Sequence, residues 1–429
     1  MSISIVILAA GKGTRMKSKT PKVLHTISGK PMLFHTIDAA QQISDDITVV
    51  LHHQADLIQA SIEQHYQDIH FHIQDIKQFP GTGGAMKGVT TQYPKTLILN
   101  GDMPLITADS LRQLTSGKSD INMSVIRLDD PSGYGRVMID ECNVQEIIEE
   151  KDCTPEQRKT QTVNAGIYCI DSELLNRYIP QLKNANAQQE YYLTDIIKMA
   201  VDENRMVAPI YVAEEEFKGV NSKYDLANAE VIMQNRIKKS LMEAGVIMRL
   251  PDTIFIDSRA TFEGECILEN GVTILGESKL INAHIKAHSV IEDAVIDNSD
   301  VGPMGRIRPQ SVLVGSHVGN FVEVKKSTLT GVKAGHLSYL GDATIDEGSN
   351  IGAGTITCNY DGKAKYKTII GKNVFVGSDT QLVAPVTIAD NVMIAAGTTV
   401  TKDVAEGSLA ISRTPLKTVT NFFYKFFGK

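Results

Sequence analysis

The sequence of 429 residues predicts an α/β domain followed by an all-β solenoid, with a helix connecting the two. Two observations predict the α/β domain: an apolar strand runs directly into a glycine-rich loop, and a second apolar strand ends in an aspartate. One observation predicts the solenoid, because an aliphatic residue recurs every six positions through much of the carboxyl half.

The first strand is the apolar run ISIVIL at residues 3–8, which is typical of a strand buried on both faces. It leads into the loop AAGKGTRM at residues 9–16. Glycines let backbone N–H groups approach an anion, and Lys12, Arg15 and Lys22 add positive charge around this loop. The spacing matches neither the Walker A pattern nor the dinucleotide-binding pattern, so a simple strand-to-helix turn remains an alternative.

The second apolar run, TLIL at residues 96–99, is followed by Asn100, Gly101 and Asp102. This order places Asp102 at the carboxyl edge of a parallel sheet, where open α/β sheets bind their ligands. An aspartate beside a phosphate-binding loop suits Mg²⁺, because a hard cation prefers carboxylate and phosphate oxygens. A turn or a helix N-cap is the simpler interpretation of an isolated aspartate.

Apolar residues at helical spacing predict a long connecting helix over residues 225–246. Asp225 is the expected N-cap, and Gly245 is the expected residue just beyond the carboxyl end. We therefore predict an α/β domain at 1–224, a linker helix at 225–246, and the solenoid with its carboxyl-terminal tail at 247–429. The apolar stripe consists of Leu226, Ala229, Met233, Ile237, Leu241 and Ala244.

A six-residue period suits a parallel β-helix, in which each flat side is one repeat and each aliphatic residue points inward. With three sides to a coil, residues 252–403 would supply about eight coils at the roughly 4.8 Å spacing of neighbouring strands. The polar residues 359–366 interrupt the period and are predicted to form a protruding loop. The recurring positions are Ile256, Phe262, Leu268, Ile274 and Leu280, then Ile370, Val376, Leu382, Ile388, Ile394 and Val400.

Composition excludes several classes of function. The net charge of −7 argues against broad binding to nucleic acid, so any anion site must be local. No apolar run approaches the roughly 18 residues that span a bilayer, and no charged leader precedes the first strand, so we expect a cytoplasmic protein without membrane insertion. The five cysteines are odd in number and lack C-x-x-C spacing, which predicts reduced, buried thiols.

Short motifs along the whole chain resemble those of a known family. The first half is similar to sugar-1-phosphate nucleotidyltransferases in LAAGKGTRM at 8–16, PKVL at 21–24, GTG at 81–83, GD at 101–102, GYGR at 133–136, Glu149, NAG at 164–166 and GVN at 219–221. Hexapeptide coils follow, with KAGHLSYLGD at 333–342 and NIGAGTITCNY at 350–360. The combination resembles bifunctional N-acetylglucosamine-1-phosphate uridylyltransferases / glucosamine-1-phosphate N-acetyltransferases, which implies a Rossmann-like nucleotidyltransferase domain and a left-handed β-helix.

For the first half, the resemblance implies transfer of UMP from UTP to N-acetylglucosamine 1-phosphate. Pyrophosphate leaves, and UDP-N-acetylglucosamine is formed for peptidoglycan and lipopolysaccharide precursors. Such transfer depends on positioning and charge neutralisation and requires no side-chain nucleophile. By resemblance, Arg15 and Lys22 act on the phosphates as catalytic residues, while Asp102 and Asn221 hold Mg²⁺. The implied nucleotide and sugar contacts are Lys22 and Asn221 together with Leu8, Ala9, Ala10, Gly11, Gln74, Gly81, Thr82, Gly135, Glu149 and Asn164.

Two positions depart from the family pattern. Pro80 adds an apparent extra residue before the GTG motif, so the glutamine that contacts uracil is Gln74 or, as the less favoured alternative, Gln78. Asn100 stands where many family members carry an aromatic hydroxyl. The sequence therefore defines the reaction class better than the nucleobase selectivity.

For the second half, the resemblance implies acetylation of glucosamine 1-phosphate by acetyl-CoA. His336 is the expected general base, because the ordinary pKa of histidine lies near neutrality, although an isolated histidine is more often structural. Arg308 and Lys325 are implied to clamp the sugar phosphate. Tyr339, Asn350 and Lys365 would complete the sugar pocket, and the implied acetyl-CoA contacts are Ala353, Asn359, Tyr360, Ser378, Ala396 and Arg413. The other histidines are predicted to be structural.

The resemblance also implies a homotrimer in which neighbouring subunits share the acetyl sites. The aromatic tail at 416–429 is expected to contact a neighbouring subunit or its own β-helix rather than a membrane. Two alternatives stay open: a nucleotidyltransferase whose β-helix only oligomerises or regulates, and a non-catalytic assembly subunit. The charged residues of the glycine loop count against a purely structural role.

Overall fold

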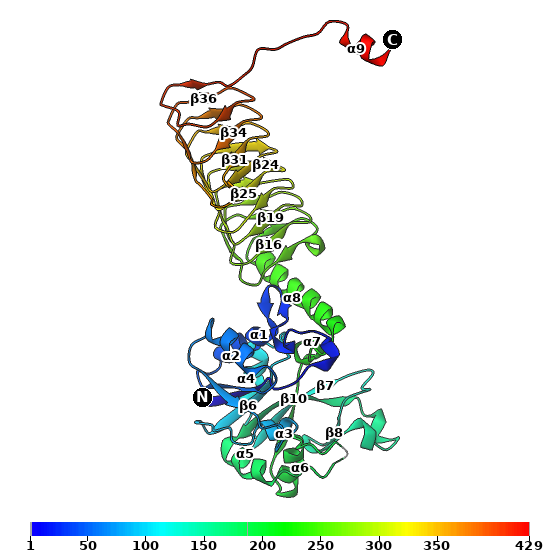
Figure 1. The fold of residues 1–429 in the computed structure, drawn as a ribbon. Coiled ribbons are helices and arrows are strands. Elements are labelled where there is room, and N and C mark those ends of the chain that lie inside the picture. Colours follow the sequence, from blue (N-terminus) through cyan, green and yellow to red (C-terminus); the bar gives the residue numbers. More distant parts are fainter. Residues whose placement is uncertain (1, 187, 429) are drawn as a thin grey trace. The chain divides into compact units, whose positions relative to one another are not determined.

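The computed structural model describes residues 2–186 and 188–428, and the chain divides into two compact units. Unit 1 comprises residues 1–233 and unit 2 comprises residues 234–429 (Figure 1). Helix α8 (Lys223–Glu243) crosses this division, so its first half belongs to unit 1 and its second half to unit 2. The domain limits at 224 and 246 remain a prediction.

A mixed β-sheet forms the centre of unit 1, with strand order β11-β7-β10-β6-β1-β4-β5. Strand β1 (Ile3–Leu8) pairs in parallel with β4 (Ile47–Leu51) on one side and with β6 (Lys95–Asn100) on the other. Strand β10 (Thr162–Asp171) is antiparallel to β6 and to β7. The remaining strands are β5 (Ile69–Ile73), β7 (Ile121–Arg127), β11 (Val207–Tyr211), and the hairpin of β8 (Arg136–Asp140) and β9 (Asn143–Ile148), which extends from β10.

Alternate residues of β1 point into two separate apolar cores, as expected for a strand buried on both faces. Ile5 and Ile7 belong to one core, and Val6 belongs to the other. Strands β4 and β6 lie on opposite sides of β1, so the order of the strands along the sheet reverses at β1. Open α/β sheets bind their ligands at the carboxyl ends of the strands beside such a switch point. The helices of unit 1 are α1 (Met32–Gln41), α2 (Ala55–Glu63), α3 (Thr82–Ala85), α4 (Ala108–Thr115), α5 (Ser172–Tyr178), α6 (Asp195–Asp202) and α7 (Glu214–Phe217).

Unit 2 is a parallel β-helix with three sheets of ten, nine and eight strands, and Figure 1 shows its strands stacked from β16 to β36. The first sheet contains β12 (Ile247–Met248), β15 (Ile267–Leu268), β18 (His284–Ile285), β21 (Asp300–Val301), β24 (His317–Asn320), β27 (Lys333–His336), β30 (Asn350–Ile351), β33 (Phe375–Val376), β36 (Met393–Ile394) and β38 (Leu409–Ala410). The second contains β13 (Phe255–Ile256), β16 (Thr273–Leu275), β19 (Val290–Glu292), β22 (Arg306–Ile307), β25 (Glu323–Lys325), β28 (Tyr339–Gly341), β31 (Ile356–Cys358), β34 (Gln381–Val383) and β37 (Thr399–Val400). The third contains β14 (Thr261–Glu263), β17 (Lys279–Ile281), β20 (Val295–Asp297), β23 (Val312–Val314), β26 (Thr328–Thr330), β29 (Ala343–Ile345), β32 (Thr368–Ile370) and β35 (Val386–Ile388).

The six-residue period correctly predicts the interior of this β-helix. All the recurring positions are buried in one continuous core except Phe262, which is partly buried against that core. Residues 359–366 form the predicted protruding loop between β31 and β32, where the backbones of Tyr360 and Lys365 pair with each other. The six-residue period therefore predicts which side chains face inward, and its interruption predicts where a loop leaves the β-helix.

The cysteines differ in part from expectation. All five thiols are free, and three of them are buried as predicted, but Cys142 is exposed because it lies in the turn between β8 and β9. Cys358 is only partly buried.

In helix α9 (Phe422–Phe427) the aromatic rings stack on one another and stay more than half exposed. Within the described residues, no helix is both long and apolar enough to cross a bilayer.

The ends of helix α8 show one error and one success of the sequence analysis. Asp225 is not the N-cap, because Ser222 takes that place. The Ser222 hydroxyl accepts a hydrogen bond from the Asp225 N–H at 3.1 Å, and the Asp225 carboxylate accepts one from the Ser222 N–H at 2.8 Å. Gly245 follows the helix with a φ of 104°, and hydrogen bonds from Gly245 and Val246 to the last turn close it as predicted.

Two buried polar side chains of α8 cover the first coil of the β-helix. Strand β13 is the first strand of its sheet, so its outer N–H and C=O groups have no neighbouring strand. The Gln234 amide bonds to both of these groups of Ile256, donating to the C=O at 2.7 Å and accepting from the N–H at 3.0 Å. The Lys238 ammonium donates to the carbonyl of Pro251 at 2.9 Å. The helix thus supplies, at the open end of the stack, hydrogen bonds that a preceding coil would supply elsewhere in the β-helix.

We predict that Gln234→Leu destabilises unit 2 by about 1 to 3 kcal/mol, because the Ile256 N–H and C=O lose their partners beneath an apolar side chain. Urea unfolding followed by circular dichroism measures this change, since the chain contains no tryptophan. The exposed neighbour on the same helix provides the control Asn235→Leu, which should change the free energy of unfolding by less than about 0.5 kcal/mol. Equal effects of the two substitutions would show that the Gln234 amide does not support the first coil.

Candidate functional site

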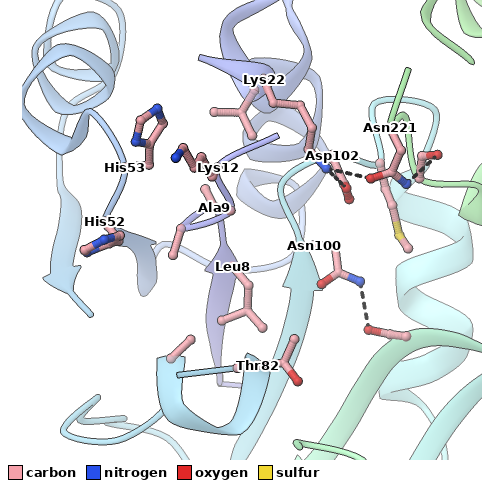
Figure 2. A pocket seen from close by; sticks show the side chains of 18 of the residues that line it. Leu8, Ala9, Lys12, Lys22, His52, His53, Thr82, Asn100, Asp102 and Asn221 are labelled. Carbon is pink, nitrogen blue, oxygen red and sulfur yellow. Dashed lines mark hydrogen bonds and ion pairs between the residues drawn. The ribbon is translucent and has the colours of Figure 1, made fainter. Parts of the chain in front are cut away.

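A cavity of about 920 Å³ opens at the carboxyl ends of β1 and β6 (Figure 2). Its wall includes the end of β1, the glycine loop, the start of α3 and the segment that precedes α8. Most residues implied by the resemblance for uridylyl transfer meet here. They are Leu8, Ala9, Ala10, Gly11, Arg15, Lys22, Gln74, Gly81, Thr82, Asp102, Asn164 and Asn221.

The glycine loop curves tightly around the stem of Lys22. Gly13 has a φ of 62°, and a Cβ at this position would lie 2.6 Å from the Cβ of Lys22. Glycine is therefore required at position 13 for both its backbone conformation and its lack of a side chain. Gly11 has open space where a side chain would stand, so its backbone is accessible from the cavity.

Lys22 lies between two oxygen-bearing side chains from distant parts of the chain. Its ammonium is 2.5 Å from Oδ2 of Asp102 and 3.0 Å from Oδ1 of Asn221. Dashed lines in Figure 2 mark these two contacts. The backbone carbonyl of Asp102 also accepts a hydrogen bond from Val220 N–H at 2.9 Å, which joins the two segments. One carboxylate and one amide oxygen thus converge on a single cation.

This pair of oxygens is suited to a divalent cation, because carboxylate and carbonyl oxygens are the ligands that hard cations prefer. The described residues contain no group of three or more His, Cys, Asp or Glu side chains arranged to hold a metal ion. A divalent cation between Asp102 and Asn221 would therefore complete its shell with phosphate oxygens and water.

Gln74 belongs to the described cavity wall, whereas Gln78 does not. Gln74 is buried in the cavity wall, and its amide nitrogen donates to the carbonyls of Phe79 at 2.9 Å and Gly81 at 3.1 Å. These bonds fix the orientation of the amide group. Gln78 is exposed. The geometry therefore favours the first of the two alternatives that the sequence left open.

Gly135 and Glu149 do not belong to the described cavity wall, although they connect to it. The Gly135 carbonyl accepts a hydrogen bond from Asn164 N–H at 3.0 Å, and a Cβ at Gly135 would lie 3.5 Å from Oε1 of Glu149. Burial raises the pKa of the Glu149 carboxyl, and the negative charges of Asp152 and Asp195 raise it further. This carboxylate is thus held near the site in surroundings that disfavour its charge.

The sequence analysis missed His52 and His53, which line the cavity although we predicted structural roles for them. They lie between the end of β4 and the start of α2, and Nδ1 of His52 is 3.2 Å from the Gln74 carbonyl. Lys12 and Asn100 also line the cavity. The carboxyl-edge rule, which identified Asp102 after β6, would have found these histidines after β4 had it been applied to every strand.

In unit 2, Lys325 and Tyr339 lie on the second sheet, and Arg308 directly follows its strand β22. Strand β25 pairs with β22 and β28, which places Arg308, Lys325 and Tyr339 on neighbouring coils. Inward residues such as Val324 alternate with them, so their side chains lie on the outer surface. The Arg308 guanidinium is 2.8 Å from Oε1 of Glu323. The register therefore brings two cationic side chains and a phenol together.

His336 ends β27 and is exposed at the corner that precedes β28. The buried Ser338 fixes this corner, because its hydroxyl donates to the carbonyls of His336 at 2.9 Å and Gly352 at 3.2 Å. Asn350 lies on the next strand of the same sheet, β30. The imidazole is thus presented at the surface by a rigid turn.

The protruding loop carries Tyr360 and Lys365 as exposed side chains. Asn359 differs from them, because it is buried and its amide donates to Oδ2 of Asp342 at 2.5 Å. This hydrogen bond anchors the loop through the side-chain nitrogen of Asn359, and the predicted contact of Asn359 with acetyl-CoA stays a prediction.

The other implied acetyl-CoA contacts follow one edge of the β-helix. Backbone hydrogen bonds of 2.8 Å join the Ala353 carbonyl to Asp379 and the Ser378 carbonyl to Gly397, so these corners stack coil upon coil. Arg413 reaches the same edge, because its Nε donates to the Ala396 carbonyl at 3.0 Å. Small residues and one arginine therefore line this edge.

Comparison with known proteins gives full-length matches. Residues 5–151 match the family model of the MobA-like NTP transferase domain, and residues 367–402 match that of the bacterial transferase hexapeptide (six repeats). A curated relative from a Sulfurovum species, named bifunctional protein GlmU, is 74% identical over 428 residues and 100% of both chains. Relatives of the same name from a Nitratiruptor species and from Aliarcobacter butzleri are 62% and 59% identical, covering at least 98% of each chain.

These matches and the strand order confirm the predicted fold class. The chain combines a Rossmann-like nucleotidyltransferase domain with a left-handed parallel β-helix of hexapeptide repeats.

We predict that Glu149→Gln stabilises unit 1 at pH 7.5 and that this gain shrinks as the pH falls toward 4.5, the ordinary pKa of a glutamate. A carboxyl whose pKa is raised in the folded chain binds a proton more tightly there than in the unfolded chain. The free energy of unfolding of the unmodified protein therefore declines as the pH rises from the unfolded-state pKa through the folded-state pKa, and a glutamine avoids this loss. Urea unfolding at several pH values measures the gain, with the exposed Asp140→Asn on β8 as the control. A gain that is independent of pH would contradict the assignment.

Proposed function

The chain belongs to the family of bifunctional GlmU proteins, and from this premise we propose how its two units divide two successive reactions. The enzyme acetylates glucosamine 1-phosphate with acetyl-CoA, and it then transfers UMP from UTP to the resulting N-acetylglucosamine 1-phosphate, releasing pyrophosphate. We assign uridylyl transfer to unit 1 and acetyl transfer to unit 2. The observation that carries this assignment is the convergence of twelve residues implied by the resemblance on one cavity of unit 1.

For uridylyl transfer, we propose that the backbone of the glycine loop and the side chains of Arg15 and Lys22 bind the UTP phosphates. The sugar phosphate oxygen then attacks the α-phosphorus in line with the departing pyrophosphate, and fixed positive charge stabilises the extra negative charge of the transition state. The buried amide of Gln74 is suited to contact the uracil. The hairpin of β8 and β9 would bring Glu149 to the sugar.

We propose that Asp102 and Asn221 hold Mg²⁺ during this reaction. The donor set fits, because the two oxygens already converge on one cation, the Lys22 ammonium. Mg²⁺ bound there would neutralise charge on the transferring phosphate. Its remaining ligands would come from the substrates and water, in keeping with the small number of protein donors.

For acetyl transfer, we propose that His336 removes a proton from the glucosamine amine as nitrogen attacks the thioester carbonyl. The C–N bond forms, the C–S bond breaks, and the coenzyme A thiolate leaves. Arg308 and Lys325 would hold the sugar phosphate, with Tyr339 beside them. Asn350 and Lys365 would complete the sugar pocket, and the acetyl-CoA contacts would be Ala353, Asn359, Tyr360, Ser378, Ala396 and Arg413.

We propose that the chain functions as a homotrimer through its β-helix. An apolar ladder supports this proposal, because Phe375, Met393 and Leu409 are partners in register on β33, β36 and β38, and each is about half exposed. Exposed apolar ladders of this kind mark subunit contacts.

A cytoplasmic location is proposed because UTP and acetyl-CoA are supplied there.

Mass spectrometry of the products tests the bifunctional assignment. The purified chain is given glucosamine 1-phosphate, acetyl-CoA, UTP and Mg²⁺, and it should form UDP-N-acetylglucosamine. Without UTP, it should stop at N-acetylglucosamine 1-phosphate. If no acetylated product forms while supplied N-acetylglucosamine 1-phosphate is still converted, the β-helix has only a structural or regulatory role.

We predict that Asp102→Ala lowers UDP-N-acetylglucosamine formation by about 100-fold or more, because the phosphates lose the anionic partner of their metal ion. Acetyl transfer should change by less than about twofold, since Asp102 belongs to unit 1. The exposed Asp109→Ala on α4 is the control for loss of a carboxylate from this unit. Equal loss of both activities in a folded Asp102→Ala protein would contradict independent sites.

We predict the reverse result for His336→Ala. Acetyl transfer should fall by about 100-fold to 10,000-fold, which is the contribution of a general base, while uridylyl transfer is retained. Lys333→Ala serves as the control, because Lys333 is exposed on the same strand, β27. Undiminished acetyl transfer in the His336→Ala protein would make this histidine structural.

A further inference from the structure

The Lys22 ammonium lies between the side-chain oxygens of Asp102 and Asn221, the two residues that we assign to the metal ion. The ammonium lies 2.5 Å from one oxygen and 3.0 Å from the other. The side chains of Lys22 and Asp102 are 12% and 20% exposed, so solvent screens this contact only in part. Figure 2 shows the ammonium directed into the gap between the two acceptors.

A divalent cation on these two oxygens would lie beside the ammonium, and the two positive charges would repel each other strongly. Mg²⁺ sits about 2.0 to 2.1 Å from each ligand oxygen, which is within the space that the ammonium fills. Asn221 has a single side-chain oxygen, and its amide nitrogen is directed toward the carbonyl of Gly219 at 3.4 Å. That oxygen already accepts a hydrogen bond from Lys22, so a metal ion binds it favourably only after the ammonium has moved away.

Lys22 has another set of partners within reach once an anion is bound. Its stem crosses the glycine loop, where a Cβ at Gly13 would lie 2.6 to 3.3 Å from its Cβ, Cγ and Cδ. Lys12, Arg15 and the accessible backbone of Gly11 line the same cavity. The ammonium can thus rotate from the two oxygens to a phosphate held on the loop while its stem stays in place.

We propose that Lys22 is an internal cation that keeps the divalent-metal site closed until the phosphates of the nucleotide bind its ammonium. This inference rests on the proposed function, specifically on the assignment of Asp102 and Asn221 to the metal. A ligand that binds only the open fraction of a protein has an apparent Kd weakened by that fraction. Metal and nucleotide consequently strengthen each other's binding, since coupling between two sites is reciprocal.

Binding of Mn²⁺ alone tests the proposal, with free Mn²⁺ measured by electron paramagnetic resonance on the full-length chain without nucleotide. The Lys22→Met protein should bind Mn²⁺ about tenfold tighter or more than the unmodified chain, because the competitor is gone. Lys22→Gln provides a second neutral variant, which gives the same comparison if the first does not fold. Circular dichroism checks the fold of each protein.

Lys12→Met is the matched control for charge. Lys12 also lines the cavity, so its removal lowers the positive field without opening the two oxygens, and Mn²⁺ affinity should change by less than about threefold. Equal tightening in the Lys12→Met and Lys22→Met proteins would overturn the proposal, because a general field would then explain both. An unchanged affinity in the Lys22→Met protein would overturn it as well.

The double variant Lys22→Met, Asp102→Asn separates this inference from the metal assignment. Loss of the tight Mn²⁺ binding in the double variant supports both. Retained tight binding would place the ion elsewhere and overturn the assignment together with the proposal. If Asp102→Asn weakens Mn²⁺ binding in the unmodified chain but Lys22→Met does not strengthen it, only the closing role of Lys22 fails.

Discussion

The parallel pairing of β1 with β6 is the constraint on which the cavity of unit 1 depends. Leu8 lies opposite Asn100 in this register, so the glycine loop after β1 and Asp102 after β6 begin at the same edge of the sheet. A shift of one residue would turn every side chain of β1 toward the other core. Because both faces of β1 are buried in apolar cores, that shift is strongly disfavoured and the edge keeps its geometry.

Unit 2 differs from unit 1 because its candidate site residues lie on the outer surface of the β-helix and not in a cavity at a sheet edge. Each coil contributes its backbone hydrogen bonds and its inward aliphatic residues to its neighbours. The outward positions are then free to vary. Register alone aligns Arg308, Lys325 and Tyr339 on one surface, and the rigid corner after β27 presents His336.

The sequence predicts most of this architecture because the relevant signals are local. A six-residue period depends only on which side chains face inward, and a buried strand followed by glycines is equally short-range. The N-cap of α8 was misplaced because Ser222 and Asp225 are both good capping residues and only their mutual hydrogen bonds decide between them. His52 and His53 were missed since no motif includes them, and Asn359 anchors its loop through a contact with Asp342 that no spacing rule predicts.

The polar side chains that cover the first coil define where the β-helix can be separated from the rest of the chain. A fragment that begins at β12 would lack Gln234 and Lys238, so the Ile256 N–H and C=O and the Pro251 C=O would lose their hydrogen-bond partners. An uncovered strand edge is a template for another chain, so such a fragment would tend to polymerise end to end. An isolated acetyltransferase unit must therefore keep the second half of α8, because this half-helix covers the edge of the first coil and prevents end-to-end association.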